Sequence, residues 1–221
     1  MEEKGKLVEV LTITKYKNEA DYKKKKAYDE IIEKCENGKC LLNAGITKMW
    51  NLIIGDSTDH YDNTNAMLGI GDKAGTTWQA STAYSLGDVV EPTTPDGNVY
   101  ECTTAGTSGA TEPTWVTGEG NTTTDNTVVW TCHTKTANAA QDDLVGANKT
   151  WKAMMATYPQ VSNQKATFQA EFGSADANYA WEECAVKNKI TAGILMNRIV
   201  ASKGTKTAGE VWTAKLEITL S

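Results

Sequence analysis

The middle of the chain differs in composition from the sequence on either side, and this difference constrains the fold more than any other feature. Residues 78–135 contain seven acidic side chains and one basic side chain, so this stretch accounts for the formal net charge of −6 while the flanks are balanced. Three of the four prolines also lie in it. Such a change, bounded by polar linkers, is typical of an inserted domain. We therefore predict three segments, at 1–77, 78–135 and 136–221.

The predicted insert is rich in Thr and Gly, and its strand candidates are short. They lie at 88–91, 99–102 and 128–132. Short strands separated by tight turns, in fewer than about 60 residues, build a small domain with a thin core. We expect this segment to be a small β module.

The flanking sequence alternates apolar and polar residues, as strands with one buried face do. The clearest runs are 166–172 and 212–220, and residues 7–14 also have strand character. Two further strands are expected at 179–186 and 194–201. The predicted fold class is mostly β: an antiparallel β-sandwich-like body with an N-terminal helix and an inserted small β module.

The N-terminal helix is predicted at residues 41–54. Apolar side chains recur there at three- and four-residue intervals, and Gly55 follows as a C-terminal cap. The charged segment 20–34 precedes it, and a second set of apolar residues falls there at helical spacing: Tyr28, Ile31, Ile32 and Cys35.

Composition and charge argue against several functions. No apolar run approaches the roughly 20 residues of a membrane-spanning helix, so we expect no membrane partner. The charged N-terminus lacks the apolar segment of a signal peptide, which indicates synthesis in a cytoplasm. Nucleic-acid binding needs a basic face, and the only basic run, 23–26, is more typical of a solvated surface. We therefore expect no nucleic-acid partner.

The cysteines and the acidic residues do not predict a metal, a cofactor or catalysis. An odd number of cysteines without a signal peptide favours buried free thiols, and the pairing state of Cys102 and Cys132 is left open. The loop 56–62 lacks the spacing of an EF-hand. Neighbouring acids such as Glu182 and Glu183 would point to opposite faces of a strand and could not flank one substrate bond. We expect a non-enzymatic protein with no catalytic residues, metal ligands or cofactors.

Four runs of the insert resemble the chitin-binding type of carbohydrate-binding module, families 5 and 12. They are 83–90 (AYSLGDVV), 97–102 (GNVYEC), 112–115 (EPTW) and 126–132 (NTVVWTC). The resemblance covers about a quarter of the chain and implies a face of aromatic rings on which sugars stack. The candidate glycan-binding residues are Trp115, Tyr100, Tyr84 and Trp130. For Tyr100 and Trp130, a place in the module's own core is the alternative that the strand positions favour.

The flanks resemble structural proteins of tailed bacteriophages. The residues that carry this resemblance include 41–45 (LLNAG), 66–72 (AMLGIGD), 155–159 (MATYP), 195–198 (LMNR) and 203–206 (KGTK). The resemblance implies a capsid decoration, head-fibre or tail-associated protein, made in the host cytoplasm and located in the virion. Its partners would be the major capsid protein or other virion proteins, and a host-surface glycan for the module.

Three functions follow as hypotheses. The preferred one is decoration or bracing of the capsid with the module displayed outward. The second is a tail or baseplate adhesin that recognises cell-surface polysaccharide. The third, an accessory part of a polysaccharide-degrading enzyme, is disfavoured by the missing acid pair and signal peptide.

The first strand also predicts assembly. It is apolar on both faces, and a strand of that kind pairs with a sheet edge, either its own or a neighbour's. We expect a homo-oligomer, such as a trimer, with this arm in subunit or capsid contacts; the candidate assembly residues are Leu7, Val8, Val10, Leu11 and Ile13.

Overall fold

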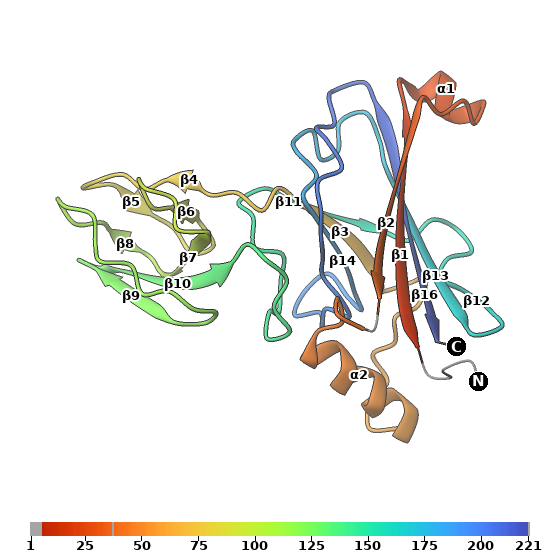
Figure 1. The fold of residues 1–221 in the computed structure, drawn as a ribbon, viewed down its shortest axis with the longest axis horizontal. Coiled ribbons are helices and arrows are strands. Elements are labelled where there is room, and N and C mark those ends of the chain that lie inside the picture. Colours follow the sequence, from red (N-terminus) through yellow and green to blue (C-terminus); the bar gives the residue numbers. More distant parts are fainter. Residues whose placement is uncertain (1–5, 37, 221) are drawn as a thin grey trace.

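The computed structural model describes residues 6–36 and 38–220, and these residues are mostly β-strand with two helices (Figure 1). The elements of the N-terminal part are β1 (Leu7–Tyr16), α1 (Glu19–Lys23), β2 (Asp29–Glu36), α2 (Asn43–Ile54) and β3 (Met67–Gly71). The middle contains β4 (Thr76–Thr77), β5 (Ala83–Tyr84), β6 (Val89–Glu91), β7 (Asn98–Thr104), β8 (Gly106–Thr107), β9 (Thr122–Asp125) and β10 (Val128–Thr134). The C-terminal part contains β11 (Lys149–Ala153), β12 (Gln160–Ser162), β13 (Lys165–Phe172), β14 (Glu183–Lys187), β15 (Ile199–Val200) and β16 (Val211–Leu220).

The flanks together form a body of two antiparallel sheets. One sheet has the strand order β12-β13-β16-β1-β2, and the other has the order β11-β3-β14-β15. Side chains of both sheets meet in the largest hydrophobic core of the chain. This arrangement confirms the predicted mostly β fold with a sandwich-like body.

Alternation along the strands explains why the sheets pack in this way. On β1, Leu11 and Ile13 are fully buried, while Val8 and Val10 point to the opposite face and are half-buried. A fully buried Leu or Ile side chain contributes roughly 1.5–3 kcal/mol to stability. The same alternation places Phe168 of β13 in this core.

The first strand lies inside its own sheet. It pairs with β16 along its whole length and with β2 over most of it, so both backbone edges are occupied within the chain. The expectation that Leu7, Val8, Val10, Leu11 and Ile13 form an arm reaching a neighbouring subunit is therefore corrected: this is a central strand, and Leu11 and Ile13 belong to the core. Oligomerisation itself stays a prediction.

The charged segment after β1 forms a short helix and a strand. The side chain of Asn18 accepts a hydrogen bond from the backbone N–H of Asp21 at 2.9 Å, which caps α1. Helical spacing at 28–35 is misleading, because Ile31, Ile32 and Cys35 lie in β2. Ile31 packs against the core while its neighbour Ile32 is 61% exposed, as expected for alternation on an edge strand.

The helix predicted at 41–54 is confirmed as α2, which ends at Gly55 in the left-handed conformation. The helix packs closely on the body at Gly45, where a Cβ atom would come within 2.3 Å of the Met196 carbonyl oxygen. Cys35 and Cys40 form a disulfide just before it. The free-thiol prediction is wrong for this pair, because the turn between them brings their Cα atoms to 6.2 Å.

The remaining cysteines, Cys102, Cys132 and Cys184, are free and buried, which answers the question left open for Cys102 and Cys132. The strands predicted at 179–186 and 194–201 are shorter in the structure, where only β14 and β15 are regular. Their irregular parts are held instead by buried polar side chains such as Asn197, whose Oδ1 accepts from the Val186 N–H at 3.0 Å.

The middle segment forms a separate lobe, here called the module (residues 76–134) (Figure 1). Its sheets have the strand orders β4-β6-β7-β10-β9 and β5-β8 and share no strand with the body. The three predicted strands correspond to β6, β7 and β10. The segment that leads into this lobe lies beside the linker that returns from it to the body, since the Ala147 N–H donates to the Ala74 carbonyl at 2.7 Å. Adjacent ends are what an insertion into another domain requires.

Glu9 is the unusual residue of the body core, and it generates a prediction on stability. Its side chain faces the core with no exposed surface; Oε2 accepts from Asn197 Nδ2 at 2.6 Å, and Oε1 has no hydrogen-bond partner among residues 6–36 and 38–220. Burial raises the pKa of Glu9 from 4.5 to about 7, against the lowering effect of the Asn197 bond.

We predict that Glu9→Gln removes a pH dependence of folding. Because the folded-state pKa is raised, the stability due to protonated Glu9 is fully present below pH 4.5 and is lost as the pH rises through about 7. The loss amounts to about 3 kcal/mol, which urea denaturation of both proteins between pH 4 and 8 should resolve. Parallel pH profiles for the wild type and the variant would contradict the prediction.

Candidate functional site

Four aromatic rings of the module form one continuous cluster. Trp130 is central, with Tyr84 at 4.8 Å and Trp115 at 6.0 Å between ring centroids, both edge to face. Tyr100 lies 4.3 Å from Trp115 on the other side. The four residues predicted from the sequence are thus brought together. Edge-to-face aromatic pairs each add about 1 kcal/mol beyond their buried area.

Burial divides these rings into two classes. Tyr100 and Trp130 have no exposed surface, so they form the module core and present no face on which a sugar could stack. Tyr84 and Trp115 are half-buried at the margin of the same cluster. Within the predicted glycan site, only these two offer accessible ring surface.

Trp115 is held in place although it lies in the loop between β8 and β9. Its Nε1 donates to Glu112 Oε1 at 2.9 Å, and the same carboxylate accepts from the Thr93 N–H at 2.8 Å. Burial raises the pKa of Glu112, but the bonds from Thr93 and Trp115 outweigh it and hold the pKa below its usual value. The ring therefore has a fixed orientation at the margin of the cluster.

The buried carboxylate of Asp125 is a residue that the sequence analysis did not single out. It accepts from Trp78 Nε1 at 2.8 Å, from Trp130 Nε1 at 3.3 Å and from the Gly109 N–H at 2.7 Å. Buried indole N–H groups require a hydrogen-bond acceptor. The tryptophans of the module were therefore the sequence feature that could have pointed to a buried carboxylate. Asp125 therefore orients the ring at the centre of the cluster.

A second buried network joins the module to the body. Arg198 and Glu183 form an ion pair at 2.6 Å with no exposed side-chain surface. The Arg198 guanidinium also donates to the Thr136 carbonyl at 3.0 Å and to Gln141 Oε1 at 2.7 Å. Glu183 accepts from the N–H groups of Val145 and Gly146, each at 3.0 Å. These contacts fix the linker that follows the module.

The network continues into the module through Gln141 and Glu119. Gln141 Nε2 donates to Glu119 Oε2 at 3.0 Å, and Glu119 Oε1 lies 2.6 Å from His133 Nδ1. Burial raises the pKa of Glu119, while the bonds from His133 and Thr134 lower it further than that, so the net shift is downward. Val145 adds an apolar contact across the junction, in a small cluster with Val89 and Val99.

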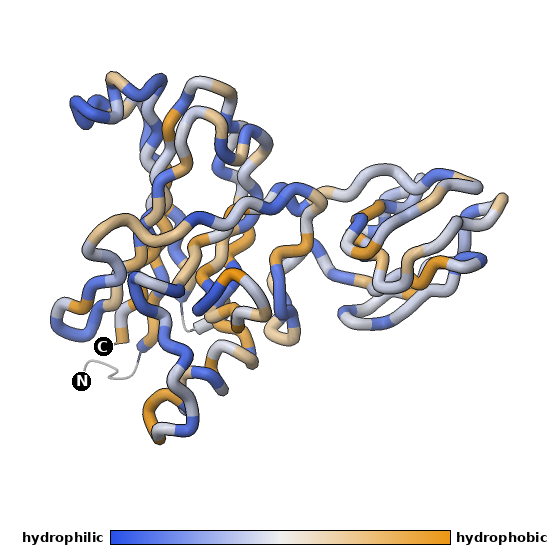
Figure 2. The backbone as a smooth tube through the Cα atoms, turned by 180° about the vertical axis from the view of Figure 1, so that it is seen from behind, coloured by the Kyte–Doolittle hydropathy of each residue, from blue (hydrophilic) through white to orange (hydrophobic). Residues whose placement is uncertain are grey.

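The outer face of α2 is the main exposed apolar surface of the body. Two of the apolar residues predicted for this helix, Leu42 and Met49, pack inward. The others form what we call the α2 stripe, with exposed fractions of 37%, 61%, 72% and 65%: Ile46, Trp50, Ile53 and Ile54. Figure 2 shows the apolar end of this helix at the lower edge of the body. Contiguous exposed apolar residues of this size mark interaction surfaces.

The acidic residues considered in the sequence have structural partners. Glu183 belongs to the junction, Glu182 lies 3.6 Å from Lys73, and Asp59 pairs with Lys189 at 2.7 Å. Over residues 6–36 and 38–220, no group of three or more His, Cys, Asp or Glu side chains is placed to hold a metal ion. In the same ranges no helix has the length and apolarity needed to cross a bilayer.

Comparison of the chain with protein-family models, curated proteins and solved structures gives no significant match.

Proposed function

We propose that this protein is a non-enzymatic structural component of a bacteriophage virion, which decorates or braces the capsid and displays the module outward. The observation that carries this proposal is the α2 stripe. A helix that exposes Trp50 and Ile53 on a body with a complete core of its own is suited to bind another protein. The phage assignment rests on the sequence resemblance of the flanks.

The charge of the stripe also favours a protein partner. Lys48 is the only charged residue of α2, and it turns away to bond Ser57 and to approach Asp59 at 3.8 Å. The exposed stripe is therefore free of charge and can be buried without desolvating an ion. A second copy of the chain and the major capsid protein are the proposed partners, and the location is the virion.

The module lies apart from this surface (Figures 1 and 2). Attachment through α2 would leave the aromatic margin of the module accessible. The buried junction around Arg198 would keep the module at a fixed position relative to the attachment surface.

We predict that the double variant Trp50→Ser, Ile53→Ser loses self-association and particle attachment. Both side chains are mostly exposed, so the variant should keep its melting temperature while losing interface contacts of roughly 1–3 kcal/mol each. Sedimentation measures the oligomer, and quantitative mass spectrometry of purified virions measures occupancy. Val161→Ser on β12 is the matched control, because Val161 is 79% exposed outside the stripe. Unchanged mass and occupancy of the double variant would contradict the proposal.

The second candidate function is a tail or baseplate adhesin that binds a host-surface glycan. The half-buried rings of Tyr84 and Trp115 favour it, because each is near an exposed apolar residue in the chain: Leu86, 69% exposed, and Val116, 46% exposed. Aromatic rings with apolar neighbours suit the C–H faces of sugars.

We predict that Trp115→Ala weakens retention of the protein on chitin or host-wall polysaccharide. Because Trp115 contacts two rings, this change should also cost about 1–2 kcal/mol of module stability, whereas Trp130→Ala should cost roughly 3–5 kcal/mol and unfold the module. Pull-down at a temperature where the Trp115 variant is folded separates binding from stability. Val161→Ala, at a 79% exposed position on β12 of the body, provides a control for non-specific loss of apolar surface. Equal retention of the wild type and the Trp115 variant would exclude a glycan site at this margin.

A further inference from the structure

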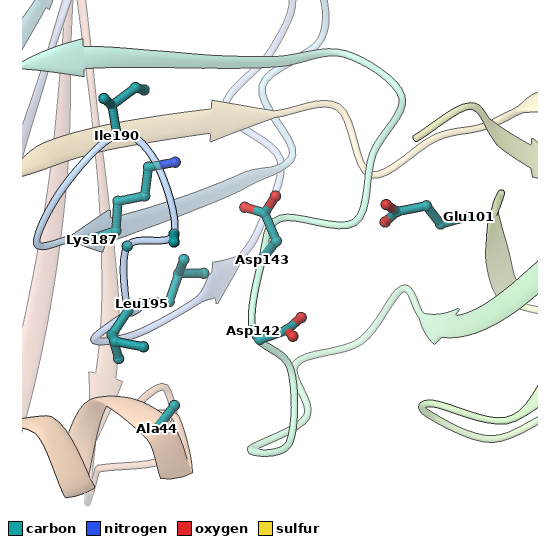
Figure 3. A pocket seen from close by; sticks show the side chains of 10 residues that line it. Ala44, Glu101, Asp142, Asp143, Lys187, Ile190 and Leu195 are labelled. Atoms are coloured by element: carbon teal, nitrogen blue, oxygen red, sulfur yellow. The ribbon is translucent and has the colours of Figure 1, made fainter. Parts of the chain in front are cut away.

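A groove separates the module from the body, next to the junction network. Its volume is about 500 Å³, within the range of small-ligand sites. The module contributes Glu101, the linker contributes Asp142 and Asp143, and the body contributes Lys187 and the loop around Gly193. Figure 3 shows the Lys187 side chain extending toward Asp143, with Glu101 on the opposite side of the opening.

Lys187 is the side chain that marks this groove as a site. It is only 7% exposed, yet among the described residues its ammonium makes no hydrogen bond and no ion pair. Its Nζ lies over the ring of Trp151, 3.9 Å from the centroid. Burial lowers the pKa of Lys187 by more than the nearby Asp143 carboxylate raises it.

The three other buried lysines each have a hydrogen-bond or ion-pair partner in the chain, unlike Lys187. Lys15 also lies over a tryptophan, Trp212, but it has an ion pair with Asp29 at 2.9 Å. Lys203 lies 3.5 Å from Glu33, and Lys206 donates to the Gly173 carbonyl at 2.8 Å. Buried cations in proteins are normally paired in this way. Lys187 has no such partner among the described residues, and the groove that it lines gives its ammonium access to an acceptor from outside the chain.

The other groups of the groove restrict the chemistry of that acceptor. Three carboxylates line the groove beside the Lys187 ammonium, and Glu101 also lies 3.7 Å from His133 Nε2. This excess of carboxylates disfavours phosphate and other anions. The carboxylates are not arranged to hold a metal ion. Ionised carboxylates are pure acceptors and suit ligand hydroxyl groups, whereas the lysine donates to a ligand oxygen. Ile190 and Leu195 add apolar surface.

We propose that this groove binds a neutral polyhydroxyl ligand, one or two sugar units of a polysaccharide, between Lys187 and the carboxylates of Asp142, Asp143 and Glu101. The inference goes beyond the proposed function, because the groove is built by the junction and the body and not by the aromatic margin of the module. Asp143, which also pairs with Lys149 at 3.4 Å, fixes one side of the site.

The floor of the groove is preorganised. Asn188 Oδ1 accepts from the Ile194 N–H at 2.7 Å and closes the loop 188–194. At Gly193, a Cβ atom would lie 2.0 Å from the Lys189 carbonyl oxygen, so a side chain cannot be placed there. Lys189 is in turn tied to Asp59 at 2.7 Å. A loop closed in this way keeps the groove open without a ligand.

The test is titration of the full chain with glucose, galactose, N-acetylglucosamine, maltose and cellobiose at tens of millimolar, followed by two-dimensional NMR. We expect at least one sugar to shift the Gly193 amide and the Trp151 indole signals. Lys187→Met keeps the apolar stem over Trp151 and should weaken this binding about tenfold, the effect of losing one charge-assisted hydrogen bond. Asp142→Asn, at an exposed position, should weaken it as well and carries little risk of misfolding.

Lys165→Met is the matched control, since Lys165 pairs with Glu217 on the far sheet and should not affect the titration. Trp115→Ala should also leave these shifts unchanged. Sugars that shift signals near Trp115 but not at Gly193 would overturn the groove site while leaving the module proposal intact. The absence of any shift at Gly193 would also overturn it. So would sugar binding by the Lys187 and Asp142 variants that is as tight as that of the wild type.

Discussion

The Arg198–Glu183 ion pair is buried completely and joins three parts of the chain. Glu183 belongs to the central region of the second body sheet, Arg198 follows it near β15, and both hold the linker that leads from the module back into the body. A charged pair in such a place is stable only when its other hydrogen-bonding groups are also satisfied. Backbone carbonyls, backbone amides and Gln141 do this here.

Much of the remaining architecture depends on this pair. Removing one partner of a buried pair costs roughly 3–5 kcal/mol, because the other charge is left without compensation. The linker residue Gln141, which accepts from Arg198, also donates to Glu119 of the module. The orientation of the module is therefore linked to the folding of the body. The module contributes Glu101 to the groove lined by Lys187 and Asp143, so this wall of the groove depends on the orientation of the module.

The module and the body each have a hydrophobic core of their own. The module gathers its aromatic rings around Asp125, whereas the body gathers apolar strand residues between two sheets. A small domain with a thin core benefits from such a fixed polar group, because the carboxylate specifies one arrangement of the rings. The α2 stripe is not needed by either core, which is why it is the proposed attachment surface.

The sequence predicts features that depend on local periodicity. The strands β13 and β16, the helix α2 with Gly55, and the strands of the module follow from alternation, spacing and turn residues. The error at β2 arose because Ile31 and Ile32 fit both a helix and an edge strand, and only pairing with β1 decides between them. The disulfide between Cys35 and Cys40 depended on the turn that this pairing creates.

The sites were less predictable than the strands. Contacts that link residues far apart, such as Arg198 with Thr136 or Trp78 with Asp125, leave no mark in local sequence. The resemblance to a carbohydrate-binding module implied that Tyr84, Tyr100, Trp115 and Trp130 lie together, and the strand positions of Tyr100 and Trp130 favoured their burial in the module core, which the structure confirms. The burial of these two rings is set by the faces of β7 and β10 that point inward.

The most direct measurement is small-angle X-ray scattering of the wild type and of Arg198→Met, with circular dichroism to verify that both remain folded. If the buried pair sets the position of the module, the wild-type profile should fit the single arrangement of Figure 1, and the variant should have a larger radius of gyration and require several module orientations. Identical profiles, or a wild-type profile that itself requires many orientations, would show that the pair does not hold the two parts together.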